Sequence, residues 1–318
     1  MGRGLHLARK LKARALSRSR GLGEVRAQAR RFRDLRRYDT PEALDAIVDW
    51  TRARLSYAKA KGAVFGVSGG VDSTLTACVL ARAAPRRVTA FVLPCGSKPA
   101  DERDARLLCK TLKIPVEKID LEPAYRAVKG LFSKAPPGSN ADGNLKTRLR
   151  TMALFHEAGV RGALFVGTGD LDEGYVGYYT KGSGSDLAPI GSLHKDEVRA
   201  LVRLALGEKS PALAKRLAAK PADAGLSGRL AEDELGVRYR DIARALEVVF
   251  QTCAVFEGGL VPKDAELFAR EFEKSGVTEA AFLRVADRVY GARHKAFGAP
   301  VLWRDDWAPN PFEELESE

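Results

Sequence analysis

One stretch of the chain, residues 63–74, constrains the fold more than any other. It reads Ala-Val-Phe-Gly-Val-Ser-Gly-Gly-Val-Asp-Ser-Thr, so a short apolar run passes through small residues and then becomes helix-like. A buried strand followed by a helix explains this change of pattern. Because Gly69 and Gly70 lack side chains, the turn between them can bend sharply and approach a ligand closely. The stretch therefore predicts a strand, a tight turn and a helix N-terminus that binds an anion.

Asp72 is the unusual residue of this turn. A carboxylate would repel a bound phosphate unless a Mg²⁺ ion lay between them. An ordinary strand-turn-helix junction is the competing interpretation, because short glycine motifs often occur by chance. The turn is not a Walker A loop, since no Gly-Lys-Ser or Gly-Lys-Thr follows it.

The net charge of +12 is unevenly distributed along the 318 residues. Residues 1–40 hold 13 Lys and Arg against three acidic residues, whereas the remainder holds 40 basic and 38 acidic residues. We therefore divide the chain into a basic arm (1–39), a globular part (40–308) and an acidic tail (309–318). Three interpretations of the arm stay open: a solvated segment, a contact for nucleic acid or another acidic partner, and an organelle presequence.

The cysteine pattern and the lack of long apolar runs suggest where the protein works. The four cysteines, Cys78, Cys95, Cys109 and Cys253, form no Cys-x-x-Cys pair. This spacing argues against a structural zinc site or a disulfide framework and fits a reducing compartment. No apolar run approaches the roughly 18 residues that span a bilayer. We expect a cytoplasmic protein with no membrane segment.

Apolar runs alternate with helical patterns through the first two-thirds of the chain. Strands are expected at residues 63–67, 87–93, 115–119 and 163–167, and a fifth should begin at 186–190. Helices are expected between them, and the chain after residue 190 should be helical. This alternation predicts an α/β fold, a doubly wound parallel five-stranded sheet with extra C-terminal helices. The loops that follow the first, second and fourth strands should then share one cleft.

The Ser-Gly-Gly-Val-Asp-Ser turn resembles the pyrophosphate loop of the PP-loop ATP pyrophosphatases, which have an adenine nucleotide alpha hydrolase-like fold. Further matches lie in order at residues 143–150, 166–173, 177–195, 233–239 and 293–307. Together these motifs resemble ammonia-dependent NAD synthetase over residues 40–308. The resemblance implies a ligase that amidates nicotinic acid adenine dinucleotide (deamido-NAD) to NAD. The carboxylate would be adenylated by ATP with release of pyrophosphate, and ammonia would then displace AMP.

The resemblance also implies roles for individual residues. Mg²⁺ would be held by Asp72 and Glu173. The residues implied to be catalytic are Asp72, Lys195, His294 and Lys295. The deamido-NAD substrate would contact Tyr178, Lys181 and Asp186. The residues implied to bind ATP are Gly66, Ser68, Gly69, Gly70, Asp72, Ser73, Arg148, Thr168 and Lys195. A homodimer with the acceptor site at its interface is implied as well, whereas a nucleic-acid partner is not favoured.

The acceptor half departs from the family pattern. The glycine-rich segment after Thr180-Lys181 is about two residues shorter than the family's, and residues 222–229 also differ. Three alternatives therefore stay open. The chain could be a diverged ligase that amidates another carboxylate, a sulfur transferase acting on RNA through a Cys95 thiolate, or a nucleotide-binding regulator without activity.

Overall fold

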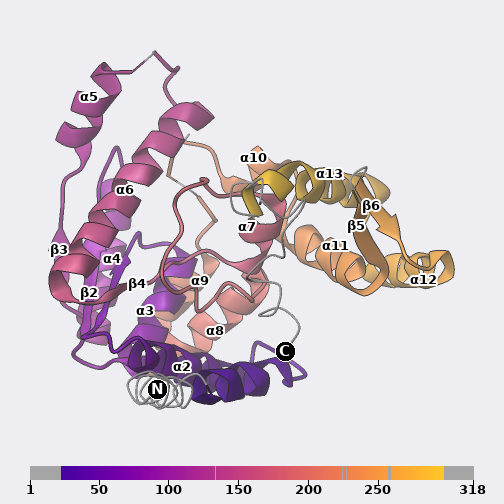
Figure 1. Ribbon diagram of the computed structural model, residues 1–318, viewed down its shortest axis with the longest axis horizontal. Coiled ribbons are helices and arrows are strands. Elements are labelled where there is room, and N and C mark those ends of the chain that lie inside the picture. Colours follow the sequence, from indigo (N-terminus) through magenta and orange to yellow (C-terminus); the bar gives the residue numbers. More distant parts are fainter. Residues whose placement is uncertain (1–22, 133, 224, 227, 257–258, 297–318) are drawn as a thin grey trace, which may run out of the picture.

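The central element of the computed structural model is a parallel sheet (Figure 1). Its strand order reverses at β1. The structure describes residues 23–132, 134–223, 225–226, 228–256 and 259–296. In this part of the chain the sheet has the order β3-β2-β1-β4. Its strands are β1 (Ala63–Gly66), β2 (Val88–Val92), β3 (Val116–Lys118) and β4 (Leu164–Phe165). Because β1 lies between β2 and β4, the carboxyl ends of β1 and β4 flank the crevice where such sheets bind ligands.

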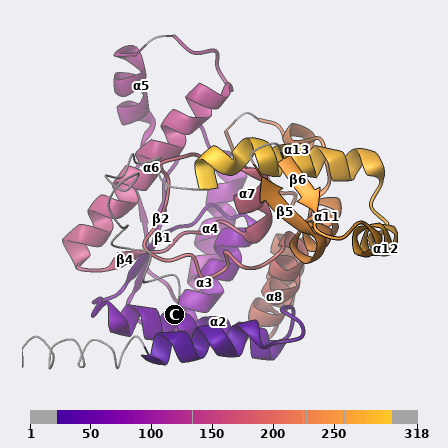
Figure 2. The same ribbon diagram turned by 45° about the vertical axis from the view of Figure 1, so that its right-hand side comes forward.

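Helices cover both faces of this sheet (Figures 1 and 2). One face carries α2 (Pro41–Tyr57), α3 (Val71–Ala83), α4 (Pro99–Leu112), α8 (Lys195–Gly207) and α9 (Pro211–Ala219). The other face carries α5 (Glu122–Gly130) and α6 (Asn140–Arg161). The arrangement confirms the predicted doubly wound α/β fold.

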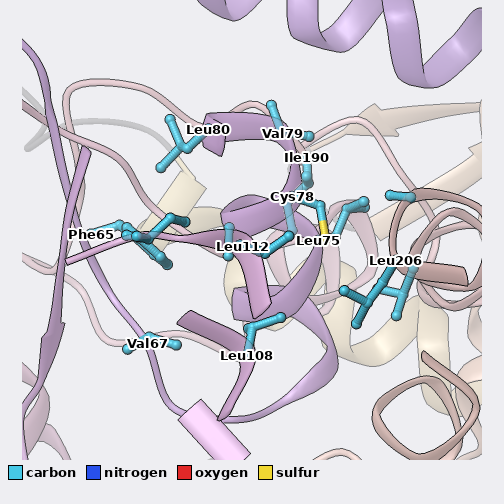
Figure 3. Packing of buried hydrophobic residues seen from close by; sticks show 14 of the residues in the cluster. Phe65, Val67, Leu75, Cys78, Val79, Leu80, Leu108, Leu112, Ile190 and Leu206 are labelled. Atoms are coloured by element: carbon cyan, nitrogen blue, oxygen red, sulfur yellow. The ribbon is translucent and has the colours of Figure 1, made fainter. Parts of the chain in front are cut away.

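Successive side chains of β1 enter two different cores, as the pleat of a strand requires. Val64 packs with Phe91 on the side of α6, and Phe65 packs with Leu75 and Leu108 on the side of α3 (Figure 3). Val64 and Phe65 are both fully buried. A strand that is apolar on both faces needs helices above and below it, which is why the run at residues 63–67 could be recognised in the sequence.

The C-terminal part forms a separate apolar cluster beside the sheet. It contains α7 (Leu171–Val176), α10 (Ala231–Leu235), α11 (Tyr239–Thr252), α12 (Ala265–Ser275) and α13 (Glu279–Ala296). An antiparallel hairpin, β5 (Cys253–Phe256) and β6 (Gly259–Pro262), interrupts these helices. The expectation of a purely helical region after residue 190 is therefore wrong at this hairpin. Contacts of α11 with α8 join the cluster to the helices that cover the sheet.

The predicted five-stranded sheet is wrong, because the described residues supply four strands. The segment expected as a fifth strand keeps one bridge, between Val166 and Leu187. At the preceding position the side chain of Asp186, instead of a backbone carbonyl, accepts the Phe165 N–H at 2.8 Å. The next residue of this segment that could donate a backbone hydrogen bond toward the β4 side is Pro189, and it has no N–H.

The described part of the basic arm is attached to the body. Residues 23–33 are helical, Val25 is buried, and Arg31 pairs with Asp49 of α2 at 3.1 Å. Residues 1–22 and the tail 309–318 lie outside the described residues. Among the described helices, none has the length and hydropathy needed to cross a bilayer.

Asp186 provides a test of this sheet edge. We expect Asp186→Ala to lower the free energy of unfolding by about 1–2 kcal/mol, because the buried Phe165 N–H loses its acceptor. Asp186→Asn retains an acceptor oxygen and should lose much less stability. Urea titrations of both variants measure the difference. Equal stability of Asp186→Ala and wild type would show that the side chain does not support the edge.

Candidate active site

The loop between β1 and α3 is closed by its own serines. We call residues 68–73 the Ser-Gly-Gly loop. The Ser73 hydroxyl lies 3.1 Å from that of Ser68, accepts the Ser68 N–H at 3.3 Å and donates to the Gly70 carbonyl at 3.1 Å. Gly70 is the N-cap of α3, and no side chain caps this helix end. The loop and the first turn of α3 therefore form a cradle of N–H groups suited to an anion.

Gly69 is required by both the conformation and the packing of this loop. Its φ of 76° lies in the left-handed region. A Cβ at this position would lie 2.5 Å from the carbonyl oxygen of Asp101 in α4. The Ser-Gly-Gly loop is thus pressed against the start of α4 and can take no larger residue at this point.

The second wall of the site is the segment between β4 and α7. Asp170 is the N-cap of α7 and accepts the Glu173 N–H at 2.8 Å, while the Glu173 side chain reaches back to the Asp170 N–H. This reciprocal cap fixes both carboxylates at the carboxyl end of β4. Thr168 lies half-buried in the same segment. Gly66, the last residue of β1, faces Leu154 of α6, and an added Cβ there would lie 3.3 Å from it.

Lys195 joins the two walls. Its ammonium lies 2.8 Å from both carboxylate oxygens of Asp72, 3.0 Å from Glu173 and 2.9 Å from Asp170. The aromatic ring of Tyr239 covers the same ammonium at 4.8 Å. The Lys195 side chain is 1% exposed, whereas Asp72 and Glu173 are 21% and 20% exposed. Three segments distant in sequence thus meet at one buried cation, which brings Asp72, Glu173 and Lys195 together.

Burial and charge oppose each other in this cluster. Burial alone would lower the pKa of Lys195, but Glu173, Asp72 and Asp170 outweigh it and hold this pKa well above its ordinary value. Burial raises the pKa of Asp170 well above its usual range and also raises the pKa of Glu173, with Lys195 acting against both increases. One ammonium therefore stabilises three carboxyl groups that are held close together.

The same carboxylates fit a hard divalent cation. The Asp170 Oδ2 atom is buried without a hydrogen-bond partner, although the Lys195 ammonium is near it. Asp72 and Glu173 are partly exposed and converge on one point. Two such carboxylates suit Mg²⁺, which keeps several waters and shares phosphate oxygens. No group of three His, Cys, Asp or Glu residues in the described part of the chain is arranged as a complete metal site.

A buried pair beneath this cluster was not predicted from the sequence. Asp172 accepts the backbone N–H of Lys195 at 2.9 Å, and its other oxygen lies 2.6 Å from Nδ1 of His194. The second ring nitrogen of His194 lies 3.1 Å from Glu247 of α11. Burial would lower the pKa of His194, but hydrogen bonds with Asp172 and Glu247 raise it to about 10. The imidazolium thus ties α7, α8 and α11 together directly behind Lys195.

The segment expected to bind the acceptor, residues 177–186, is held mainly through its backbone. Arg148 donates to the Lys181 carbonyl at 3.2 and 3.3 Å. Asn144 accepts the Thr180 hydroxyl at 2.6 Å. Both of these partners belong to α6, so α6 positions the segment.

Lys295 of α13 holds the start of the same segment. Its ammonium donates to the carbonyls of Gly177 and Tyr179 at 2.8 and 3.0 Å. The side chain of His294, in the same helix, lies outside the described residues. Tyr178 donates its hydroxyl to Glu234 of α10. Arg148 and Lys295 were expected near the nucleotide and the reacting groups, and here they bind the backbone of this segment.

Cys95 does not have the surroundings of a reactive thiolate. Its side chain is fully buried, and burial raises its pKa. It is also a free cysteine. The sulfur-transfer interpretation therefore has no support at this residue.

The site geometry agrees with comparisons to known proteins. A family model described as NAD synthase matches residues 43–295. The chain belongs to the NAD synthase family. Its match to the NH(3)-dependent NAD(+) synthetase of Hyperthermus butylicus is 38% identical over 69% of this chain and 77% of the relative. The enzyme of the same name from Methanosarcina mazei is 32% identical over 83% of this chain and 98% of the relative.

Two solved structures have the same fold as this chain. An NMN synthetase from Francisella tularensis superimposes with a TM-score of 0.66 and 27% identity, over 81% of this chain and 96% of the other. An NH3-dependent NAD synthetase from Campylobacter jejuni superimposes with a TM-score of 0.63 and 20% identity, over 82% and 97%. The second match supports the fold alone.

The raised pKa of His194 predicts a pH-dependent stability. Its pKa rises from 6.5 to about 10 on folding. The imidazolium therefore stabilises the fold fully below pH 6.5, and this contribution is lost as the pH rises toward 10. Between about pH 7 and 10, wild type should lose about 2–4 kcal/mol more stability than His194→Gln. Urea titrations across this pH range test the predicted loss of stability. His156→Gln, on the exposed side of α6, is the control. Parallel curves for wild type and His194→Gln would contradict it.

Proposed function

We propose that this protein amidates deamido-NAD to NAD with ammonia, using ATP and Mg²⁺. The observation that carries the proposal is the convergence of Asp72, Glu173 and Lys195 at the Ser-Gly-Gly loop. These residues come from three separate segments and meet only in the folded chain. NH(3)-dependent NAD(+) synthetases that match most of this chain support the choice of acceptor.

The residues of the site answer the main difficulty of the reaction, which is bringing a carboxylate to the α-phosphate of ATP. The N–H groups of the Ser-Gly-Gly loop would receive the leaving pyrophosphate. Asp72 and Glu173 would hold Mg²⁺, which supplies charge neutralisation at the phosphates when bound. Lys195 adds a positive charge beside the same loop. The buried acidic cluster keeps this ammonium protonated, since its pKa is raised.

The two chemical steps balance without another reactant. In the first, a carboxylate oxygen of deamido-NAD bonds to the α-phosphorus of ATP and the bond to the β-phosphate oxygen breaks, so pyrophosphate leaves. In the second, ammonia attacks the acyl carbon of the adenylate, AMP departs and one proton is released. The residues 177–186, with Tyr178 and Lys181, are the part of the chain that we propose to bind the dinucleotide.

A product assay tests this function. Incubation with Mg-ATP, ammonium and deamido-NAD should give NAD, AMP and pyrophosphate in equal amounts. Nicotinic acid mononucleotide is tested in parallel, because an NMN synthetase is among the structural relatives. If ATP is cleaved with neither of the two acceptors, the proposed acceptor class is wrong. That result would not contradict ATP binding at the loop.

The two proposed metal carboxylates give a sharper prediction. We expect Asp72→Asn and Glu173→Gln each to lower turnover by at least about a hundredfold, since each removes a metal ligand. The fold should persist, because Lys195 keeps two other carboxyl partners. Steady-state rates with circular dichroism as the folding check measure both effects. Asp196→Asn, an exposed acid in the first turn of α8, is the control. A near-wild-type rate in either variant would remove that residue from the metal site.

We also propose that the protein forms a homodimer through α6. Exposed apolar side chains line this helix, with Met152 61% and Val160 70% exposed. Leu131 and Phe132 follow α5 and are exposed as well. A helix face of this kind is usually covered by a partner.

The α6 proposal predicts the effect of a charged surface. Met152→Glu combined with Val160→Glu should convert a dimer into a monomer at micromolar concentration, because two buried charges per subunit would oppose association. Analytical ultracentrifugation measures the mass. Leu283→Glu changes an apolar residue on α13 that is 52% exposed and should leave the dimer intact. A monomeric wild type would contradict the proposal directly.

The remaining assignments are also proposals. We propose that residues 40–308 form the catalytic unit, with the basic arm (1–39) and acidic tail (309–318) as flanking segments. The free cysteines of the described chain support a reducing, cytoplasmic setting.

A further inference from the structure

The Ser-Gly-Gly loop has a partner that the proposed mechanism does not use. Lys220 follows the end of α9 and lies 151 positions after Gly69. Its ammonium donates to the Gly69 carbonyl at 3.1 Å, to Asp101 at 2.6 Å and to Asp104 at 3.0 Å. Asp101 and Asp104 both belong to α4. One lysine thus connects the loop after β1 with the helix after β2.

The bond to Gly69 controls the direction of the next N–H group. In a trans peptide, the Gly69 carbonyl and the Gly70 N–H lie in one plane and point in opposite directions. A carbonyl held by Lys220 therefore turns the Gly70 N–H toward the inside of the loop, where it donates to the Ser68 hydroxyl at 3.2 Å. Because a glycine has few conformational restraints of its own, two contacts fix this orientation, one inside the loop to Ser68 and one outside it to Lys220.

Lys220 is itself fixed to the helix that carries Lys195. Arg199 of α8 donates to the Lys220 carbonyl at 3.0 Å and also to the Ala218 carbonyl. Lys195 is the first residue of α8. A continuous set of contacts therefore runs from α8 through Lys220 to Gly69.

The carboxylates of α4 hold the Lys220 ammonium in place. Asp104 is buried, and it also pairs with Arg216 of α9. An added Cβ on Gly69 would lie 3.0 Å from the Asp104 Cβ, so this carboxylate lies directly behind the loop. The two acids neutralise the ammonium, which makes Lys220 a poor direct ligand for phosphate and a good support for a carbonyl.

We propose that Lys220, oriented by Asp101 and Asp104, is a positioning residue that holds the Ser-Gly-Gly loop in the conformation that binds pyrophosphate. This inference rests on the proposed function, in which that loop receives the pyrophosphate of ATP. It assigns Lys220 no contact with substrate. Its effect is transmitted through the Gly69–Gly70 peptide.

Binding of magnesium pyrophosphate, measured by isothermal titration calorimetry, tests the proposal without catalysis. We expect Lys220→Met to weaken binding about tenfold, a loss typical of one charge-assisted hydrogen bond. Lys220→Arg keeps a donor for Gly69 and should recover most of the affinity. Lys118→Met is the matched control, because it removes a lysine that pairs with Glu102 of the same α4 helix at 2.9 Å.

Asp104→Asn separates positioning from simple charge. If only net charge mattered, removing a carboxylate near the loop would strengthen pyrophosphate binding. Positioning predicts the opposite, a weakening of about threefold, because Lys220 loses one of its restraints. Tighter binding by Asp104→Asn, or unchanged binding by Lys220→Met, would overturn the proposal. The absence of ATP and pyrophosphate binding in wild type would instead remove the proposed function and this inference with it.

Discussion

The buried contact of Lys195 with Asp72, Asp170 and Glu173 is the interaction on which the rest of the site depends. It joins the loop after β1, the segment after β4 and the start of α8. One ammonium cannot neutralise three ionised carboxylates, and burial raises the pKa of Asp170 and Glu173. Behind the cluster, a second group of charged side chains joins α7, α8 and α11.

His194 and its partners form this second group of charged side chains. Asp172 is adjacent to Glu173 and holds both the Lys195 N–H and the His194 ring. Glu247 brings in α11 from the C-terminal cluster. Charged groups thus link the core on the α8 side of the sheet to the C-terminal cluster, at the point where Glu173 and Lys195 must keep their relative positions. A rigid outer layer of this kind is what orients the groups of an active site.

Local sequence was sufficient to predict some of these features. The strand at 63–66, the turn at Gly69 and the start of α3 follow from apolar pattern and glycine alone, and they are present. The family resemblance added Glu173 and Lys195 to the same site. The direction of the Lys195 side chain could not be predicted from the local sequence, since it depends on carboxylates from two other segments. The single available signal for His194 was its position directly before Lys195, which carries no information about Asp172.

The wrong prediction of a fifth strand has its physical origin in a side chain that replaces a backbone partner. Asp186 was expected to begin a strand, but its carboxylate takes the Phe165 N–H and ends the ladder. The acceptor segment itself is held through its backbone, because Arg148 binds the Lys181 carbonyl. A segment held through carbonyl groups accepts changes in its side chains without losing its place. These carbonyl contacts are made at Gly177, Tyr179 and Lys181, directly before the segment 182–186 that differs from the family pattern, so this difference leaves them in place. In the proposed function, the acceptor preference would therefore depend on the side chains of residues 177–186.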